Sequence, residues 1–232
     1  MKRTQDTFEK KGAEFVSTPF SIKERLLRIK AIVCDWDGVF HSGYKDEHGS
    51  SSFSETDSMG INMLRFGFYL ENKALPTTAI ITGENNETAY YWAEREHLDA
   101  VLFKIKNKAE ALPFLKKQFD IKPEEILFVY DDILDLSLAK EVGLRFLVNK
   151  KANPLFIEYC KERKLCDYIT ACGGNENALR EISEVCLNLM GRFNETIDER
   201  IQYDGIYHEY ITERNEIQTE VLTLKDGLPI GR

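Results

Sequence analysis

Two aspartates separated by one residue follow an apolar run in the segment AIVCDWDGVF, residues 31–40. Taken alone, such a pair is typical of a turn or a helix cap. It could also carry out phosphoryl transfer, in which one carboxylate attacks phosphorus and a second acid moves the proton. We therefore treat Asp35 as the candidate nucleophile and Asp37 as the candidate acid and base. Gly38 follows, and a glycine lets the backbone come close to a phosphate group.

Polar residues also lie at the end of a second apolar run, residues 78–82, and a third, residues 126–130, is followed by Asp131 and Asp132. Thr82 and Gly83 end the segment IITG, where a hydroxyl and a backbone N–H could hold phosphoryl oxygens. Lys108 opens a helical pattern, and its ammonium could clamp the same group. Each residue alone has a simpler explanation, as a strand residue, a turn or a solvated charge. Their shared position at strand ends favours a functional site.

A cluster of acids after residues 126–130 indicates a metal site, because Mg²⁺ prefers oxygen ligands and keeps several waters. We expect Asp35, Asp37, Asp131 and Asp132 to form it, with Asp37 contributing its backbone carbonyl. Asp132 and Asp135 would also orient the directly bound carboxylates. The cofactor predicted on these grounds is Mg²⁺.

The segments that must position these residues alternate between strand and helix patterns. This alternation predicts an α/β fold, a Rossmann-like and mainly parallel sheet with helices on both faces. In such sheets ligands bind at the carboxyl ends of the strands. The predicted strands are residues 31–34, 78–82, 100–103, 126–130, 144–148 and 167–170, and the predicted helices are 61–73, 86–98, 107–119, 135–142 and 177–191.

Three segments lie outside this alternation. Residues 39–57 contain two glycines and a serine run, which suggests a β-hairpin flap above the site. We expect residues 1–27 to be a leader, with a short helix before the first strand. Residues 28–190 would form the catalytic domain, and residues 191–232 an appendage or an oligomer arm.

Composition narrows the possible partners. The chain has 232 residues, of which 43% are apolar, and a formal net charge of −8. The negative charge argues against a nucleic-acid surface, and no apolar run is long enough to span a membrane. The five cysteines form no C-x-x-C pair, so we expect reduced thiols in a cytoplasmic protein.

The segments DWDGV and IITG, together with Lys108 and DDILD, resemble the four motifs of the haloacid dehalogenase superfamily of phosphatases. The resemblance covers roughly residues 28–190. Asp35 and Thr82 are 47 positions apart, and Thr82 and Lys108 are 26 apart, so neither gap holds a cap domain. The chain is thus similar to the capless branch, which contains octulosonate 8-phosphate and nonulosonate 9-phosphate phosphatases. This resemblance implies a homotetramer that acts on a small phosphorylated molecule.

The sequence also departs from the octulosonate enzymes. Glu84 stands where they usually have arginine, and Tyr130 stands where a small glycine is usual. Glu84 would suit a hydrogen-bond donor on the substrate, or it could simply be an acid at a helix start. Arg180, in the segment GGNENALRE, could reach a substrate carboxylate across a subunit boundary. Helix spacing equally allows it an ion pair with Glu176 or Glu184.

The sequence therefore predicts a Mg²⁺-dependent phosphatase of a phosphorylated keto-sugar acid that forms an aspartyl phosphate. One alternative keeps this chemistry for a nucleotide or another small phosphate ester. A second is a non-catalytic assembly module that has kept the fold. We also expect His41 to be a solvated loop residue and Trp36 to pack beneath the end of the sheet.

Overall fold

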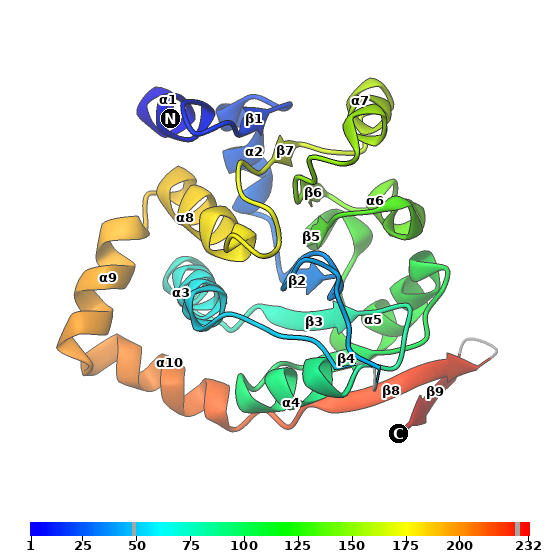
Figure 1. The fold of residues 1–232 in the computed structure, drawn as a ribbon. Coiled ribbons are helices and arrows are strands. Elements are labelled where there is room, and N and C mark those ends of the chain that lie inside the picture. The colour runs from blue at the N-terminus through cyan, green and yellow to red at the C-terminus, as the bar shows by residue number, and fades with distance from the viewer. Residues whose placement is uncertain (48–49, 226–227) are drawn as a thin grey trace.

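A nine-stranded sheet forms the centre of the computed structural model, which describes residues 1–47, 50–225 and 228–232 (Figure 1). The strand order is β1-β7-β6-β5-β2-β3-β4-β8-β9. All neighbouring strands are parallel except the two edge pairs, β1 with β7 and β8 with β9. The predicted α/β fold is therefore confirmed. The strands are β1 (Glu14–Phe15), β2 (Ala31–Cys34), β3 (Thr77–Ile81), β4 (Ala100–Leu102), β5 (Ile126–Tyr130), β6 (Leu144–Leu147), β7 (Tyr168–Ile169), β8 (Glu220–Lys225) and β9 (Leu228–Gly231).

Helices cover both faces of this sheet. One hydrophobic core joins the sheet to α2, α3, α4, α8 and α10, and a second joins its other face to α5, α6 and α7. The helices are α1 (Lys2–Glu9), α2 (Pro19–Leu26), α3 (Glu55–Asn72), α4 (Glu87–Arg95), α5 (Leu112–Phe119), α6 (Leu136–Ala139), α7 (Pro154–Glu162), α8 (Ala178–Met190), α9 (Phe193–Gln202) and α10 (Gly205–Asn215). The described residues also form three 3₁₀ helices, η1 (Lys108–Ala111), η2 (Pro123–Glu125) and η3 (Ile133–Asp135).

Strand β2 shows why the sheet is covered on both sides. Ile32 and Cys34 point into one core, and Ala31 and Val33 point into the other. Successive side chains of a strand face opposite sides, so a continuous apolar run requires two buried faces. This arrangement fixes β2 in the middle of the sheet.

The register of the central strands brings the predicted site residues to one edge. Cys34 of β2 pairs with Ile80 of β3 on one side and with Val129 of β5 on the other. Asp35, Thr82 and Asp131 therefore leave neighbouring parallel strands at their carboxyl ends. No cap domain interrupts the described residues between these strands.

The N-terminal residues are part of the fold and not a leader. Helix α1 packs against α8, and β1 extends the sheet by pairing antiparallel with β7. The pairing joins Glu14 to Ile169 and Phe15 to Tyr168, two strands far apart in the sequence. A two-residue strand carries too short a pattern to be recognised from the sequence alone.

The C-terminal residues are likewise integrated, which corrects the expected appendage. Strand β8 pairs in parallel with β4, with Val101 opposite Val221, and so lengthens the central sheet. Helices α9 and α10 run around the outside of α3 before the chain returns to the sheet (Figure 1). Tyr207 and Tyr210 of α10 are buried in the same core as α3. The described residues of 191–232 are therefore continuous with the domain.

The predicted hairpin flap is absent from the described part of its range. Residues 39–47 and 50–54 form turns and irregular backbone, and helix α3 already begins at Glu55. Ser54 caps that helix by accepting a hydrogen bond from the Thr56 N–H. The serines that suggested a turn therefore include a helix cap. The two remaining residues of the range, 48 and 49, lie outside the described structure.

Candidate active site

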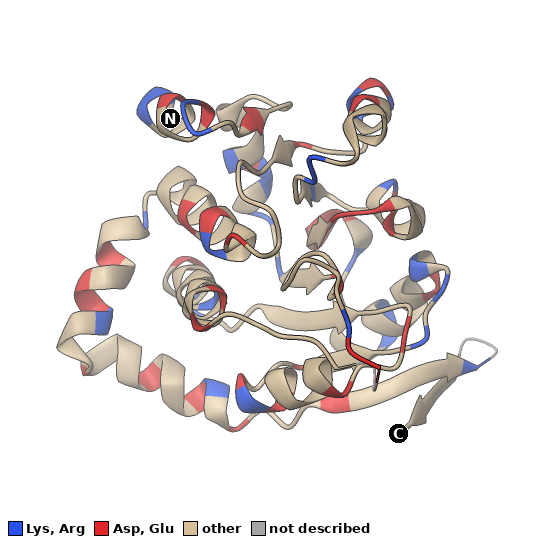
Figure 2. Ribbon diagram, in the orientation of Figure 1, with Lys and Arg blue, Asp and Glu red and all other residues tan. Residues whose placement is uncertain are grey.

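Three buried carboxylates meet where β2 and β5 end. Asp35, Asp131 and Asp135 each offer an oxygen, and these oxygens all lie within 4.8 Å of one another. Asp35 follows β2, whereas Asp131 follows β5 and Asp135 ends η3. Figure 2 shows the acidic stretch of ribbon that leaves β5 toward α6. Such closely placed like charges require positive charge nearby.

Lys108 supplies part of that charge. It is fully buried, and its ammonium contacts the Asp35 carboxylate and lies 2.5 Å from Asp135 Oδ1. Burial lowers the pKa of Lys108, but Asp35 and Asp135 outweigh this effect and raise it to about 12. Lys108 is therefore a permanent cation. The 3₁₀ helix η1 begins at this residue, so the backbone directs the side chain into the cluster.

Burial also governs the acids themselves. It raises the pKa of Asp35 well above its ordinary value, against the opposing effect of Lys108. Burial and the neighbouring Asp135 raise the pKa of Asp131 to about 6, although Lys150 contacts its carboxylate. Strong perturbation of this kind at the end of a sheet is typical of functional sites.

Asp37 lies in a different environment at the rim. Lys45 Nζ is 2.7 Å from Asp37 Oδ2, and His41 Nε2 is 3.2 Å from Asp37 Oδ1. Asn86 Nδ2 donates to the same oxygen at 3.4 Å. Burial alone would raise the pKa of Asp37. The effects of His41 and Lys45 lower it by more, so the pKa is below its ordinary value. Asp37 is thus held as a carboxylate.

His41 is buried, which corrects the expectation of a solvated loop histidine. Its Nδ1 accepts a hydrogen bond from the Gly43 N–H at 3.1 Å. Nδ1 therefore carries no proton, and Nε2 carries it, 3.2 Å from Asp37 Oδ1 but without hydrogen-bond geometry. The burial results from a nearby segment: the backbone at Gly174 packs directly on the carbonyls of Gly38 and His41 and leaves no room for a side chain.

Gly38 has the conformation that its predicted role requires. Its φ is +91°, and a Cβ at this position would collide with the Asp131 carboxylate. Only glycine tolerates both the backbone angle and the close approach. The loop after β2 therefore lies directly against the acidic cluster.

The residues after β3 are divided between the interior and the surface. Thr82 is completely buried, and its Oγ1 accepts a hydrogen bond from the Glu84 N–H at 3.4 Å. Gly83 is buried beside it. Glu84 is exposed and pairs with the exposed Lys106. The side chain of Glu84 therefore has a lysine partner at the surface of the molecule.

Asp135, and not Asp132, completes the acidic cluster. Asp132 is exposed, and its carboxylate accepts the Ile133 N–H at 2.7 Å as a helix cap. Asp135 is buried, and its Oδ2 accepts the Asp131 and Asp132 N–H groups. Asp135 therefore holds the backbone of this loop and also belongs to the group of three buried carboxylates. Asp37 contributes no side-chain oxygen to the cluster.

The three carboxylates fit a divalent cation. Asp131 is nearly fully buried, and neither of its carboxylate oxygens has a hydrogen-bond partner of good geometry among the described residues. Buried carboxylates are stabilised by cations, and hard oxygen donors in this number suit Mg²⁺ or a similar ion. The donor set would be Asp35, Asp131 and Asp135.

Arg180 lies apart from this cluster. Its Nε donates to Glu184 at 2.8 Å, which is one of the ion pairs that the helix spacing allowed. Its backbone N–H donates to Asp57 Oδ1, also at 2.8 Å, so Asp57 caps helix α8. A contact between Arg180 and substrate across a subunit boundary stays a prediction.

The two aromatic residues in the motifs have structural roles. Trp36 is buried, stacks on Phe40 and donates its indole N–H to Ser51 Oγ at 2.9 Å. Tyr130 is also buried, stacks on Phe128 and donates its hydroxyl to the Leu165 carbonyl at 2.8 Å. Tyr130 therefore points into the second core and leaves the acids after β5 undisturbed.

A small polar cavity of about 150 Å³ adjoins His41. Serine hydroxyls and amide groups form much of its wall, together with Phe40 and Phe53. Such donors and acceptors suit a ligand with several hydroxyl groups. The polar lining residues include Ser42, Ser52, Ser54, Asn175 and Asn177.

Sequence reasoning missed three residues around the site. Lys45 and Asn86 contact Asp37, and Lys150 contacts Asp131. Asn86 is fully buried as the cap of α4, and the sequence pattern Asn-x-x-Ala gives only its capping role. The two lysines lie in loops without a strong pattern, so only the folded chain brings them to the acids.

No protein-family model matches the chain. The 3-deoxy-D-manno-octulosonate 8-phosphate phosphatase KdsC of Escherichia coli K12 is 28% identical over 174 residues, which cover 72% of this chain and 84% of KdsC. The KdsC of Salmonella typhi is 28% identical over 187 residues, covering 78% and 89%.

Solved structures show the same architecture. A hydrolase of Legionella pneumophila assigned to subfamily III A of the haloacid dehalogenase (HAD) superfamily has a TM-score of 0.65 and 27% identity, covering 79% of this chain and 95% of its own. The octulosonate phosphatase of Moraxella catarrhalis, in complex with magnesium, phosphate and KDO, has a TM-score of 0.63 and 24% identity, covering 77% and 97%. At that identity the second comparison shows the fold.

The strand order, the buried strand-end acids and these relatives show that the chain is similar to HAD-superfamily hydrolases, consistent with a phosphoric monoester hydrolase. Within that superfamily the chain is similar to KdsC. The resemblance seen in the sequence motifs is thereby confirmed.

Proposed function

We propose that the chain is a Mg²⁺-dependent phosphatase that hydrolyses a phosphorylated keto-sugar acid through an aspartyl phosphate on Asp35. The observation that carries the proposal is the buried contact of Asp35 with Lys108 beside Asp131 and Asp135. A carboxylate next to a permanent cation is well placed to attack an anionic phosphoryl group, because the cation offsets the repulsion between them.

Each step has a residue of suitable chemistry. Asp35 attacks phosphorus, and the bond to the ester oxygen breaks. Asp37, a carboxylate in the structure, would first take up a proton from solvent at the rim of the site and then pass it to the leaving oxygen. Asp37, again a carboxylate, then accepts a proton from the water that attacks the acyl phosphate and releases phosphate. Lys108, the Thr82 hydroxyl and the backbone at Gly83 would hold the phosphoryl oxygens.

The metal site follows from the same acids. Asp35, Asp131 and Asp135 would hold Mg²⁺, and the backbone carbonyl of Asp37 remains a proposed fourth contact. When bound, the ion neutralises charge on the phosphoryl oxygens and the carboxylates. The relative from Moraxella catarrhalis is described with magnesium and phosphate, and one from Haemophilus influenzae with cobalt, which supports a divalent ion.

The proposed substrate class draws on the relatives and on the cavity beside His41. The KdsC relatives are named for an octulosonate 8-phosphate. The hydroxyl and amide groups of the cavity suit the hydroxylated chain of such a sugar acid. The proposed class includes eight-carbon and nine-carbon keto-sugar acids. Glu84 is a proposed contact for a hydrogen-bond donor on such a substrate.

A kinetic comparison tests the proposal. Octulosonate 8-phosphate and nonulosonate 9-phosphate are assayed for phosphate release beside nucleotides and a generic aryl phosphate. Preference for one sugar acid supports the substrate class, and preference for a nucleotide would establish the alternative phosphatase. Release from none of them, with no Mg²⁺ binding, would favour the non-catalytic assembly module.

The assembly state and cellular location are further parts of the proposal. We propose a cytoplasmic homotetramer, supported by exposed apolar side chains beside the site, Ile133 and Leu155. None of the five cysteines is in a disulfide, and no helix among the described residues is long and apolar enough to cross a membrane. Light scattering on the purified protein measures the assembly directly.

A further inference from the structure

A second polar pocket lies outside the proposed active site, between α3, the end of α4 and the helices α9 and α10. Its volume is about 270 Å³, below the range of most drug-sized ligand sites and enough for a small ion or metabolite. Arg200 and Arg214 line it, together with Tyr203, Tyr207 and Asn62. Nothing in the proposed phosphatase mechanism uses these residues.

The guanidinium group of Arg200 has one buried nitrogen, Nε, without an acceptor among the described residues. Among the described residues, Arg200 makes no hydrogen bond and no ion pair, and its buried Nε lacks an acceptor. The guanidinium carbon instead lies 4.9 Å and 5.2 Å from the ring centroids of Tyr203 and Tyr207. A buried donor without an acceptor is costly, so its retention at a pocket wall indicates an acceptor that binds there.

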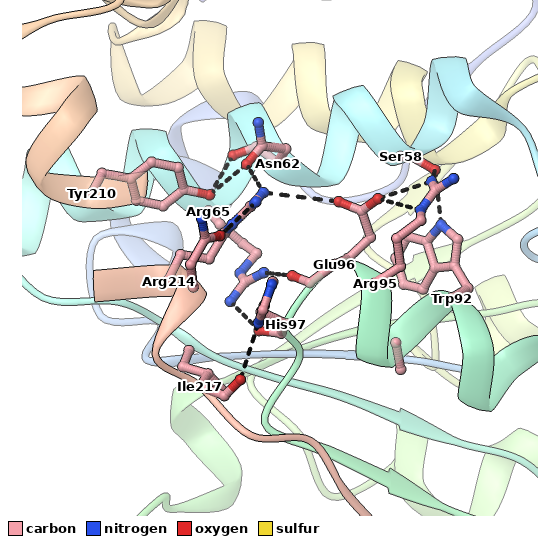
Figure 3. Close-up of polar contacts among 12 residues, drawn as sticks. Ser58, Asn62, Arg65, Trp92, Arg95, Glu96, His97, Tyr210, Arg214 and Ile217 are labelled. Atoms are coloured by element: carbon pink, nitrogen blue, oxygen red, sulfur yellow. Dashed lines mark hydrogen bonds and ion pairs between the residues drawn. The ribbon is translucent and has the colours of Figure 1, made fainter. Parts of the chain in front are cut away.

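Arg214 is held rigidly at the same pocket. Its Nη1 donates to Asn62 Oδ1 at 2.8 Å, and the Tyr210 hydroxyl donates to the same oxygen, also at 2.8 Å (Figure 3). The Asn215 side chain accepts from its Nε and Nη2. These partners are neutral amides, so they orient the guanidinium without cancelling its charge.

The acids of the pocket are already paired with another arginine. Glu55 and Glu96 both line the pocket, and Arg95 binds each of them, at 2.6 Å and 2.8 Å. Arg214 is 3.9 Å from Glu96, at the outer limit of an ion pair (Figure 3). The pocket therefore keeps excess positive charge in a chain whose overall charge is −8.

Two neighbouring groups, Arg65 and the Tyr207 hydroxyl, make the pocket more suitable for an anion. Arg65 is fully buried, and its terminal nitrogens donate only to the backbone carbonyls of Glu96 and His97, at 2.7 and 2.9 Å (Figure 3). The Tyr207 hydroxyl accepts a hydrogen bond from Asn62 Nδ2 at 3.2 Å, so its own proton can still be donated. The pocket thus combines positive charge with a free donor.

We propose that this pocket is a binding site for a small tetrahedral dianion, a phosphate or sulfate group, either free or as part of a small metabolite. Arg200 and Arg214 would bind its oxygens through their planar N–H pairs, which match this geometry. The Tyr207 hydroxyl would donate a third hydrogen bond. The site is formed by the C-terminal helices and is separate from the proposed catalytic acids.

Site-resolved NMR tests the proposal with sulfate as the probe. The Mg²⁺-loaded full chain is labelled so that the arginine Nε–H signals are observed while sulfate is added. The signals of Arg200 and Arg214 should shift to saturation. Arg163, which lies over Tyr159 on α7, is the matched control for an arginine stacked on a tyrosine. Its signal should change little and without saturation.

Variants then measure the contribution of the unpaired arginine. Arg200→Gln should weaken the sulfate affinity reported by Arg214 by about tenfold or more, and Arg200→Lys should weaken it less. Arg163→Gln should leave that affinity within about twofold of the wild-type value. If Arg200→Gln does not fold, the Arg200→Lys comparison still decides. Shifts that never saturate, or equal effects of Arg200 and Arg163 substitutions, would reduce the site to general ionic contact and overturn the proposal.

A free phosphate and a metabolite phosphate are distinguished by a second titration. Inorganic phosphate and a small sugar phosphate are compared at the same arginine signals in the Asp35→Asn variant, which prevents turnover. Tighter binding of the ester supports a metabolite site, and equal binding supports a site for the free ion. Failure of both to shift Arg200 would contradict the proposal even if the phosphatase assignment holds.

Discussion

Replacing Lys108 with methionine tests how the acidic cluster is held together. The substitution keeps most of the side-chain volume and removes a fully buried ammonium that contacts Asp35 and Asp135. Breaking one partner of a buried ion pair costs about 3–5 kcal/mol, because the remaining charges are left uncompensated. A typical domain has only about 5–15 kcal/mol of stability, so the loss should be large.

The measurement is urea denaturation followed by circular dichroism, in a metal chelator and again with excess Mg²⁺. In the chelator, Lys108→Met should lose about 3–5 kcal/mol of unfolding free energy. With Mg²⁺, part of the loss should return, since the ion would replace the missing positive charge. Phosphatase activity should stay low in both conditions, because the phosphoryl group loses its cation.

Lys106→Met is the control for this experiment. Lys106 is two residues away and carries the same charge, but it is exposed and pairs with the exposed Glu84. An exposed pair contributes about 0–1 kcal/mol, so the control should stay near the wild type. Equal losses in the two variants would refute the reasoning that burial makes Lys108 the counter-ion of the cluster.

Three further outcomes are expected. Gly38→Ala should destabilise the protein by about 1–3 kcal/mol and impair activity, because its φ of +91° and the adjacent Asp131 exclude a Cβ; Gly191→Ala, with a φ of +82° and open space, separates strain from collision. In a chelator, the pKa of Asp131, raised to about 6, means that the native state holds its proton more tightly than the unfolded chain. The contribution of Asp131 should therefore decrease by about 2 kcal/mol as the pH rises from 4 to 6, measured as the difference between wild type and Asp131→Asn, and a flat difference would contradict it. Tyr210→Ala should cost about 3–5 kcal/mol in urea denaturation, whereas the exposed Ile201→Ala should cost little, and equal small effects would show that the C-terminal helices are dispensable.

The parallel sheet could be predicted because its strands are continuous apolar runs. Residues 31–34 and 126–130 coincide with β2 and β5, and the polar residues after them do meet at one edge. Hydrophobic periodicity specifies which segments are strands, and the parallel α/β rule specifies which ends meet. The approach of Asp35 and Asp131 follows from these two facts, whereas Lys108 reaches Asp35 from the 3₁₀ helix η1.

The edges of the sheet could not be predicted in this way. Strand β1 has two residues, and β8 pairs with β4 across more than a hundred positions of sequence. Both depend on partners that are distant along the chain, and no local pattern encodes such pairing. The expected leader and appendage were wrong for this physical reason.

Within the site, the errors concern local turns. The 3₁₀ turn of η3 directs Asp132 outward and returns Asp135 to the side of Asp131. The cluster therefore contains Asp135, four positions after Asp131, and not the adjacent Asp132. The segment DDILD shows three acids after β5, but the sequence alone does not indicate which of them is buried. His41 became a buried neighbour of Asp37 because Gly174 packs over its loop, which only the tertiary structure reveals.

The central claim is that Asp35 forms a covalent phosphoryl intermediate, and chemical trapping tests it most directly. The protein is mixed with Mg²⁺ and an excess of substrate, quenched during turnover and treated with borohydride, which reduces an acyl phosphate to an alcohol. Mass spectrometry should then find homoserine at position 35, at no other aspartate and only when substrate is present. Turnover without this conversion, or undiminished turnover by Asp35→Asn, would contradict the account.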